Sequence, residues 1–100
     1  MDYKEFKETI LAAANDETVE LRVKYTDGRE LKLYVDEWEI KLPEYNGVPL
    51  VSYGWGYLET LAMKGLWENY PGDNCTIMKI YNCEFQISVH KKMSLDDYML

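Results

Sequence analysis

The chain has 100 residues, of which 18 are acidic and 11 are basic, so its formal net charge is −7. This length suits a single domain spanning residues 1–100, and 47% hydrophobic residues argue against an intrinsically disordered chain. The longest uncharged run covers only residues 45–58 and contains three glycines and a proline, whereas a membrane-spanning helix needs about 20 apolar residues. We therefore expect a cytoplasmic protein without a membrane segment.

The ionisable and metal-binding residue types exclude several functional classes. Direct nucleic-acid binding needs a basic face that displaces counterions, and the acidic balance argues against one. One histidine and two cysteines lack the spacing of any zinc motif, so we expect no bound metal and no cofactor. Two cysteines do not form a disulfide framework, which fits the cytoplasmic expectation.

The first predicted element is a helix over residues 2–14. Tyr3, Phe6 and Ile10 recur at the spacing of one helix face, while charged residues occupy the other positions. Asn15 and Asp16 favour turns over helix interiors and are expected to end the helix.

Two strands are expected next, because apolar residues alternate with polar ones over 19–25 and over 31–35. A three-residue loop over 26–28 keeps both apolar sets on one face by pairing Val23 with Leu31 and Val19 with Val35. Gly28 then takes the left-handed position of a bulged hairpin turn.

After Val35 the alternation slips by one residue, which leaves two interpretations. The strand has a bulge at Asp36–Glu37, or these two residues form a tight turn into a third strand. The turn is favoured because it keeps every apolar side chain on one face. It pairs Trp38, Ile40 and Leu42 with Val35, Leu33 and Leu31, respectively.

The second half of the chain is predicted to be a loop over 43–56, a helix over 57–70 ended by Pro71–Gly72, and a hairpin. An Asn82–Cys83 turn would join the two strands of this hairpin, and residues 91–100 would form a tail or a short helical turn. The predicted fold is α+β with two layers, in the order helix, hairpin or meander, helix, hairpin. Both helices lie on one face of a mainly antiparallel sheet.

The segment 45–57 is the strongest candidate for a binding site, because it holds four aromatic residues and three glycines without any charge. Tyrosine and tryptophan give a large contact area at low entropic cost, which suits recognition of a protein or a small ligand. The alternative is that these rings fold back and complete the core of a small domain. The four residues are Tyr45, Tyr53, Trp55 and Tyr57.

A cluster of acids lies close to this segment in the sequence and is expected to steer a basic partner toward it. The alternative is a solvated sheet face whose charges prevent edge-to-edge pairing. The cluster consists of Asp36, Glu37, Glu39 and Glu44.

Cys75 and His90 are the only pair that suggests catalysis. With an Asn82–Cys83 turn they would lie directly opposite each other, about 5 Å apart at Cβ, and Asp73 could orient the imidazole. An ordinary cross-strand pair is the alternative, and no oxyanion donors can be named. Cys83 lies at the far end of this hairpin, too distant for a disulfide with Cys75. We therefore assign no catalytic residue and expect no enzymatic activity.

The sequence favours a non-enzymatic protein-binding module that acts by occupying the surface of a partner, most simply one with a basic surface. Its size and charge are those of many phage and mobile-element inhibitors of host defence nucleases, of the anti-CRISPR or anti-restriction type. The alternative function is a small-molecule-binding or sensor domain with a pocket under the segment 45–57. A homodimer is compatible with the apolar C-terminal residues Tyr98, Met99 and Leu100.

Overall fold

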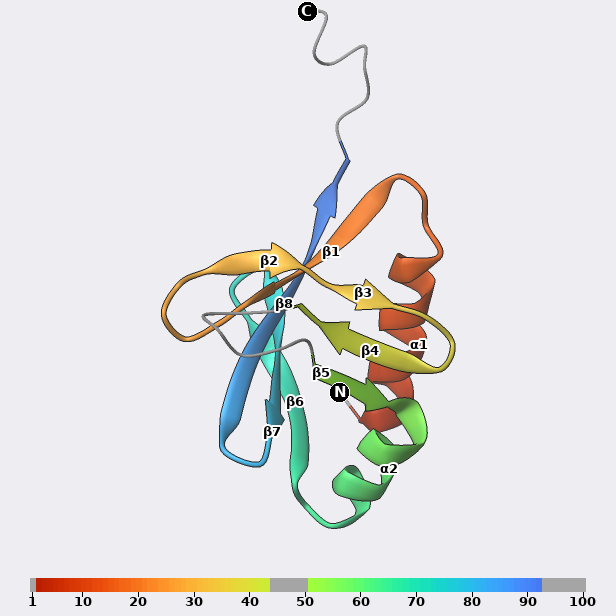
Figure 1. Cartoon of the computed structure of the whole chain (residues 1–100), viewed down its shortest axis with the longest axis vertical. Helices are drawn as coiled ribbons and strands as arrows, with labels where there is room; N and C mark the ends of the chain where they lie inside the picture. The colour runs from red at the N-terminus through yellow and green to blue at the C-terminus, as the bar shows by residue number, and fades with distance from the viewer. Residues whose placement is uncertain (1, 44–50, 93–100) are drawn as a thin grey trace, which may run out of the picture.

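A computed structural model describes residues 2–43 and 51–92. Over these residues the chain is a small α+β domain with one hydrophobic core, which confirms the predicted fold class. The elements follow in the order α1 (Tyr3–Ala14), β1 (Val19–Lys24), β2 (Glu30–Lys32), β3 (Tyr34–Val35), β4 (Glu39–Leu42), β5 (Val51–Gly54), α2 (Trp55–Met63), β6 (Trp67–Gly72), β7 (Cys75–Ile80) and β8 (Cys83–Lys91) (Figure 1).

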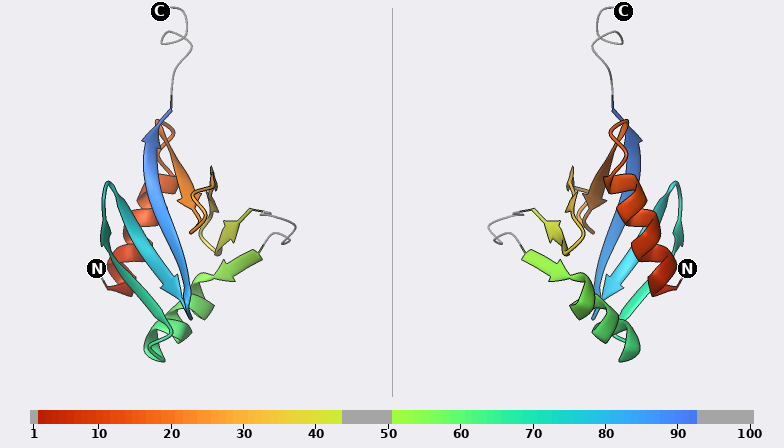
Figure 2. Two further views of the ribbon diagram at one scale, coloured as in Figure 1. Left: turned by 90° about the vertical axis from the view of Figure 1, so that its left-hand side faces the viewer. Right: turned by 90° about the vertical axis from the view of Figure 1, so that its right-hand side faces the viewer.

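The strands form two antiparallel sheets. The larger has five strands in the order β2-β1-β8-β7-β6, and the smaller has three in the order β3-β4-β5. Figure 2 shows α1 lying across the five-stranded sheet, while the smaller sheet stands to one side. Apolar residues that alternate along each strand are buried between these elements. Function must therefore be sought on the outer faces and in the gaps between elements.

The predicted first helix is confirmed. The Asp2 carboxylate accepts a hydrogen bond from the backbone N–H of Glu5 and caps the helix at its N-terminus. Phe6 and Ile10 are buried on its inner face, as their spacing indicates. The first hairpin also has the predicted register, with Val23 opposite Leu31 and Gly28 at φ +90°.

The predicted pairing of Val19 with Val35 is wrong, because the second strand breaks at Leu33. Leu33 still donates a hydrogen bond to the Leu21 carbonyl at 2.9 Å, but the chain then leaves the large sheet and pairs with β4. This switch encloses Leu33 and Ile40 in the core and leaves a gap beside the first residues of β1.

The strand predicted after the Asp36–Glu37 turn exists as β4, but the turn before it comes one residue later than predicted. The Asp36 side chain accepts hydrogen bonds from the backbone N–H groups of Trp38 and Glu39, at 2.8 and 2.9 Å, and so fixes a turn with Glu37 and Trp38 at its tip. Val35 consequently pairs with Ile40 rather than with Trp38. The predicted pairs of Leu33 with Ile40 and of Leu31 with Leu42 are wrong for the same reason.

The predicted loop and second helix are wrong in their bounds. Val51–Gly54 forms β5 against β4, and the helix runs over Trp55–Met63 instead of 57–70. Gly65 has φ +73° and ends the helix in the left-handed conformation that glycine favours. The following residues then form β6, an edge strand, where Pro71 is tolerated.

The last hairpin turns at Tyr81–Asn82 rather than at Asn82–Cys83. Ile80 pairs with Cys83 and Met78 with Phe85, so every cross-strand partner differs from the predicted one by two residues. Tyr81 adopts φ +57° in this turn. The strand β8 continues to Lys91, and residues 93–100 of the predicted tail lie outside the described residues.

Candidate functional site

The structure divides the aromatic segment between core and surface. Trp55 is 2% exposed, and its ring packs edge-on against Tyr3 and Phe6. Its indole N–H donates to the Asp36 carbonyl at 2.9 Å, and its own carbonyl accepts from the Tyr3 hydroxyl. Trp55 is therefore a core residue that ties α1 and α2 to the β3–β4 turn. Tyr45 lies outside the described residues.

Tyr57 and Tyr81 are exposed, and the partly buried Tyr53 lies beside Tyr57. Tyr81 was not among the predicted site residues. The Tyr53 and Tyr57 rings stack with centroids 6.4 Å apart and planes 2° from parallel. The Tyr57 and Tyr81 hydroxyls lie 2.9 Å apart in a hydrogen bond, although these side chains come from α2 and from the β7–β8 turn. We call these three residues the tyrosine surface.

The hydroxyls of Tyr53 and Tyr57 stay neutral over a wider pH range than a free phenol. The hydrogen bond with Tyr81 raises the pKa of Tyr57, and partial burial raises the pKa of Tyr53, with smaller contributions from Cys83 and Tyr57. Neutral phenols both donate and accept hydrogen bonds, while their rings offer an apolar face. The tyrosine surface thus combines the two properties that enrich tyrosine at protein interfaces.

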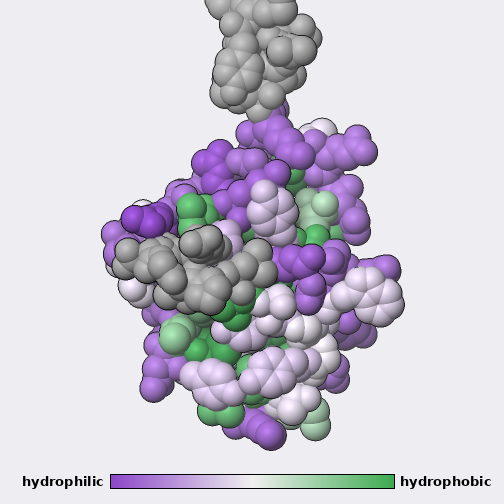
Figure 3. Space-filling model, viewed as in Figure 1, coloured by the Kyte–Doolittle hydropathy of each residue, from purple (hydrophilic) through white to green (hydrophobic). Residues whose placement is uncertain are grey.

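Leu66, just after α2, lies next to this surface. Tyr57 and Tyr81 are 48% and 53% exposed, and the Leu66 carbonyl accepts a hydrogen bond from the backbone of Tyr81. Leu66 and Met63 are also exposed. In Figure 3 the lower part of the visible face is pale and green, whereas the part over β1 and β2 is strongly hydrophilic. Such a contrast marks a candidate contact area rather than an evenly solvated surface.

The acids of the predicted cluster have different surroundings in the structure. Asp36 is engaged in the β3–β4 turn, where the hydrogen bonds from Trp38 and Glu39 lower its pKa. Glu39 pairs with Lys41 at 3.4 Å, while Glu37 is exposed at the tip of the turn. Glu44 lies outside the described residues. The turn does present Trp38, which is 74% exposed, next to the start of α2.

The predicted juxtaposition of Cys75 and His90 is wrong. The β7–β8 register pairs Thr76 with Ile87, so the two residues are offset by two positions along the hairpin. On their other sides, His90 pairs with Glu20 of β1 and Cys75 with Gly72 of β6. Cys75 and His90 are therefore not directly opposite each other.

His90 instead belongs to a polar cluster on the outer face of the large sheet, which the sequence analysis missed. Its Nε2 lies 2.8 Å from the Ser88 hydroxyl and 3.0 Å from a Glu30 carboxylate oxygen. Activation of a serine requires one ring nitrogen for the hydroxyl and the other for the carboxylate. Both contacts here involve the same nitrogen, so the cluster lacks the geometry of a catalytic triad.

The two thiols should react at different rates. Cys83 is exposed and Cys75 is partly buried, and both are free. We expect iodoacetamide at neutral pH to alkylate Cys83 first, as followed by mass spectrometry of peptides from the native protein. Faster labelling of Cys75 would contradict this environment and would revive the thiol hypothesis.

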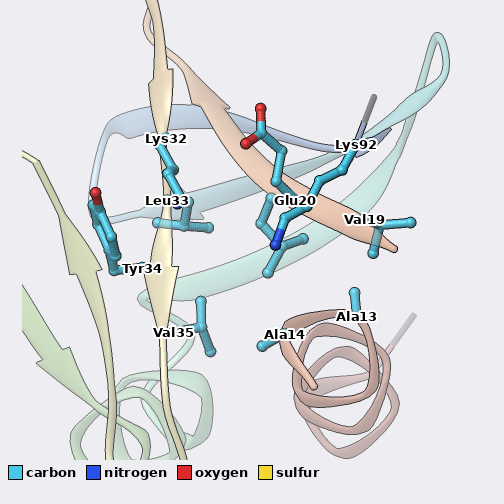
Figure 4. A pocket seen from close by; sticks show the side chains of 10 residues that line it. Ala13, Ala14, Val19, Glu20, Lys32, Leu33, Tyr34, Val35 and Lys92 are labelled. Carbon is cyan, nitrogen blue, oxygen red and sulfur yellow. The ribbon is translucent and has the colours of Figure 1, made fainter. Parts of the chain in front are cut away.

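A cavity of about 190 Å³ lies between the end of α1 and the start of β1 (Figure 4). In Figure 1 this is the opposite end of the molecule from α2 and the β7–β8 turn. The cavity opens where the chain leaves β1 between β2 and β3, beside the last turn of α1. Its position differs from the pocket expected under the segment 45–57. Its exposed lining is more polar than apolar, and four polar side chains contribute to it: Glu20, Lys32, Tyr34 and Lys92.

Comparisons of the chain with protein-family models, with curated proteins and with solved structures give no match. Among the described residues, no group of three histidine, cysteine, aspartate or glutamate side chains is placed to hold a metal ion. Neither α1 nor α2 is long and apolar enough to cross a membrane. The functional argument therefore rests on the tyrosine surface.

Proposed function

We propose that the protein is a non-enzymatic binding module that occupies a partner protein through the tyrosine surface. The observation that carries this proposal is the hydrogen bond between Tyr57 and Tyr81, two half-exposed side chains from separate elements. Such a bond holds the rings in place before contact, so little conformational entropy is lost on binding. Ordered tyrosines of this kind are frequent hot spots of protein interfaces.

The net charge of −7 favours a partner with a basic surface, because opposite charges accelerate encounter and like charges oppose it. The same repulsion acts between two copies of this chain and disfavours a homodimer. Within this proposal, the partner is a nucleic-acid-binding enzyme, most specifically a host defence nuclease. The protein would be an inhibitor of phage or mobile-element origin that acts in the cytoplasm.

The proposal is tested by capture from a lysate of the source cell, followed by a cleavage assay with the captured protein. Three immobilised baits are compared: the wild type, the double variant Tyr57→Ala/Tyr81→Ala, and Tyr34→Ala. Tyr34 is a matched control because it is 51% exposed but points to the opposite face of the three-stranded sheet from Tyr53.

We expect the wild type and Tyr34→Ala to retain one basic protein at equal stoichiometry, and the double variant to lose it. The wild type should also inhibit nucleic-acid cleavage by that protein, less so at higher salt because screening weakens the encounter. A partner retained by the double variant would refute the tyrosine surface. A captured partner without nuclease activity would refute only the inhibitor assignment.

A further inference from the structure

The strand β6 forms one edge of the five-stranded sheet (Figure 2). It pairs with β7 on one side over all six of its residues, and no strand of the described part of the chain pairs with its other side. Neighbouring residues of an antiparallel strand direct their backbone N–H and C=O groups to opposite sides. One side of β6 therefore carries backbone groups that β7 cannot reach, and such an edge is suited to pairing with another chain.

A hydrogen bond just before this strand shows which of its residues face outward. The Leu66 carbonyl accepts from the backbone N–H of Tyr81 at 2.8 Å, so Leu66 and every second residue after it face β7. Trp67, Asn69 and Pro71 consequently direct their backbone groups to the open side. Within residues 2–43 and 51–92, nothing accepts a hydrogen bond from the backbone N–H of Trp67 or Asn69. Pro71 fits an outward position, since proline has no N–H to donate.

Side chains hold this edge in place. The Asn69 Nδ2 donates to the Thr76 hydroxyl at 2.6 Å and to the Ile77 carbonyl at 3.1 Å, which ties β6 to β7 in addition to their backbone pairing. The buried Trp67 ring packs against Phe6 and so anchors the start of the strand on α1. An edge ordered in this way loses little conformational entropy when a further strand pairs with it.

An open pocket of about 330 Å³ lies beside this edge, between β6 and the first turn of α1. Its exposed lining is more apolar than polar and consists of Glu5, Asn69, Pro71, Cys75 and Thr76. A strand paired with β6 would direct every second side chain to the face of the sheet that bears this pocket. The Glu5 carboxylate has no ion pair with a described residue, so this face favours a lysine or an arginine.

We propose that β6 receives an extended segment of the partner protein, which adds a strand to the five-stranded sheet and places a basic side chain beside Glu5. Strand addition draws its affinity from main-chain hydrogen bonds and its specificity from side-chain pockets. The inference rests on the proposed function, because the segment belongs to the partner of the tyrosine surface. The two contacts are continuous, since Leu66 adjoins that surface and directly precedes β6. The net charge of −7 disfavours a second copy as the occupant.

Amide hydrogen exchange tests the added strand, with the partner captured by the wild-type bait as the probe. In the free protein, we expect the amides of Trp67 and Asn69 to exchange at least about tenfold faster than those of Glu68 and Tyr70, which face β7. In the complex, exchange at Trp67 and Asn69 should slow at least about tenfold. Unchanged exchange of these two amides in the complex would overturn the added strand and leave the tyrosine surface intact.

Two substitutions at one position provide a second test. Asn69→Pro and Asn69→Ala both remove the side chain, but only Asn69→Pro removes the outward N–H. With the fold of both checked by circular dichroism, Asn69→Pro should bind the partner at least about tenfold more weakly than Asn69→Ala does. Equal affinities of the two variants would overturn the proposal.

The remaining outcomes separate this inference from the proposed function. Loss of binding in Tyr57→Ala/Tyr81→Ala together with equal affinities of the two Asn69 variants would support the tyrosine surface and refute the added strand. A wild-type bait that captures no partner would refute both. Slow exchange at Trp67 and Asn69 that develops with protein concentration, without any partner, would show that a second copy occupies β6 and would overturn its assignment to the partner.

Discussion

Replacing Trp55 by alanine should lower the free energy of unfolding by about 3–5 kcal/mol. The ring is 2% exposed and packs against Tyr3 and Phe6, so its removal leaves a cavity in the core. The substitution also removes the donor to the Asp36 carbonyl, which holds the β3–β4 turn to α2. Urea unfolding followed by circular dichroism measures the change.

Trp38→Ala is the matched control for this prediction. It also removes a tryptophan side chain, but Trp38 is 74% exposed at the tip of the β3–β4 turn. We expect this substitution to change the free energy of unfolding by no more than about 0.5 kcal/mol, as for surface substitutions generally. Similar losses in Trp55→Ala and Trp38→Ala would contradict the division of the aromatic residues between core and surface.

Alkaline pH should unfold the protein through its tyrosines. Partial burial raises the pKa of Tyr3, Tyr25 and Tyr53, and the hydrogen bond with Tyr81 raises that of Tyr57. A raised pKa means that the folded state binds the phenolic proton more tightly than the unfolded state does. This stabilisation is complete below the unfolded pKa of about 10 and is lost as the pH rises through the higher folded values.

Thermal unfolding between pH 8 and pH 11.5 tests this expectation, with tyrosine ionisation followed by absorbance near 295 nm. The melting temperature should be level up to about pH 10 and then fall steeply. Tyr53→Phe retains the ring but cannot ionise, so its melting temperature should fall less over the alkaline range. Equal alkaline losses in the wild type and Tyr53→Phe would argue that Tyr53 is not desolvated in the fold.

Local patterns were sufficient to predict the first helix and the first hairpin. In α1 the capping residue and the apolar spacing both favour the observed helix. At Gly28 the loop length and the left-handed conformation both favour the observed turn. The residues of each element are close together in the chain. Local interactions therefore determine these two structures, and long-range contacts were not needed to predict them.

Strand register was harder to predict, because a shift of two residues leaves every side chain on the same face. The predicted and observed pairings of β7 with β8 differ by such a shift, so alternation alone could not separate them. The residues in the turns determined the register instead. The Asp36 carboxylate fixed one turn, and Tyr81 adopted a positive φ in the other, which sequence rules expect mainly of glycine and asparagine.

Two residues of the tyrosine surface, Tyr53 and Tyr57, were predicted from the sequence, but Tyr81 was not. With the helix starting at Trp55, residues 55, 58 and 61 share its buried face, and Tyr57 points outward. A helix placed at 57–70 hides this division. Tyr81 was missed because its partner Tyr57 is 24 residues away, and only the fold brings them together. The Leu33 break and the resulting cavity depend on a second sheet that the sequence pattern did not indicate.

The most direct test of the central claim is the affinity of the captured partner, measured by isothermal titration calorimetry at low and at physiological salt. The account predicts that Tyr57→Ala/Tyr81→Ala weakens the Kd by at least about 30-fold, that Tyr34→Ala leaves it within about twofold, and that salt weakens binding by the wild type. A Kd unchanged in the double variant, with its fold intact by circular dichroism, would contradict the claim that the tyrosine surface is the binding face.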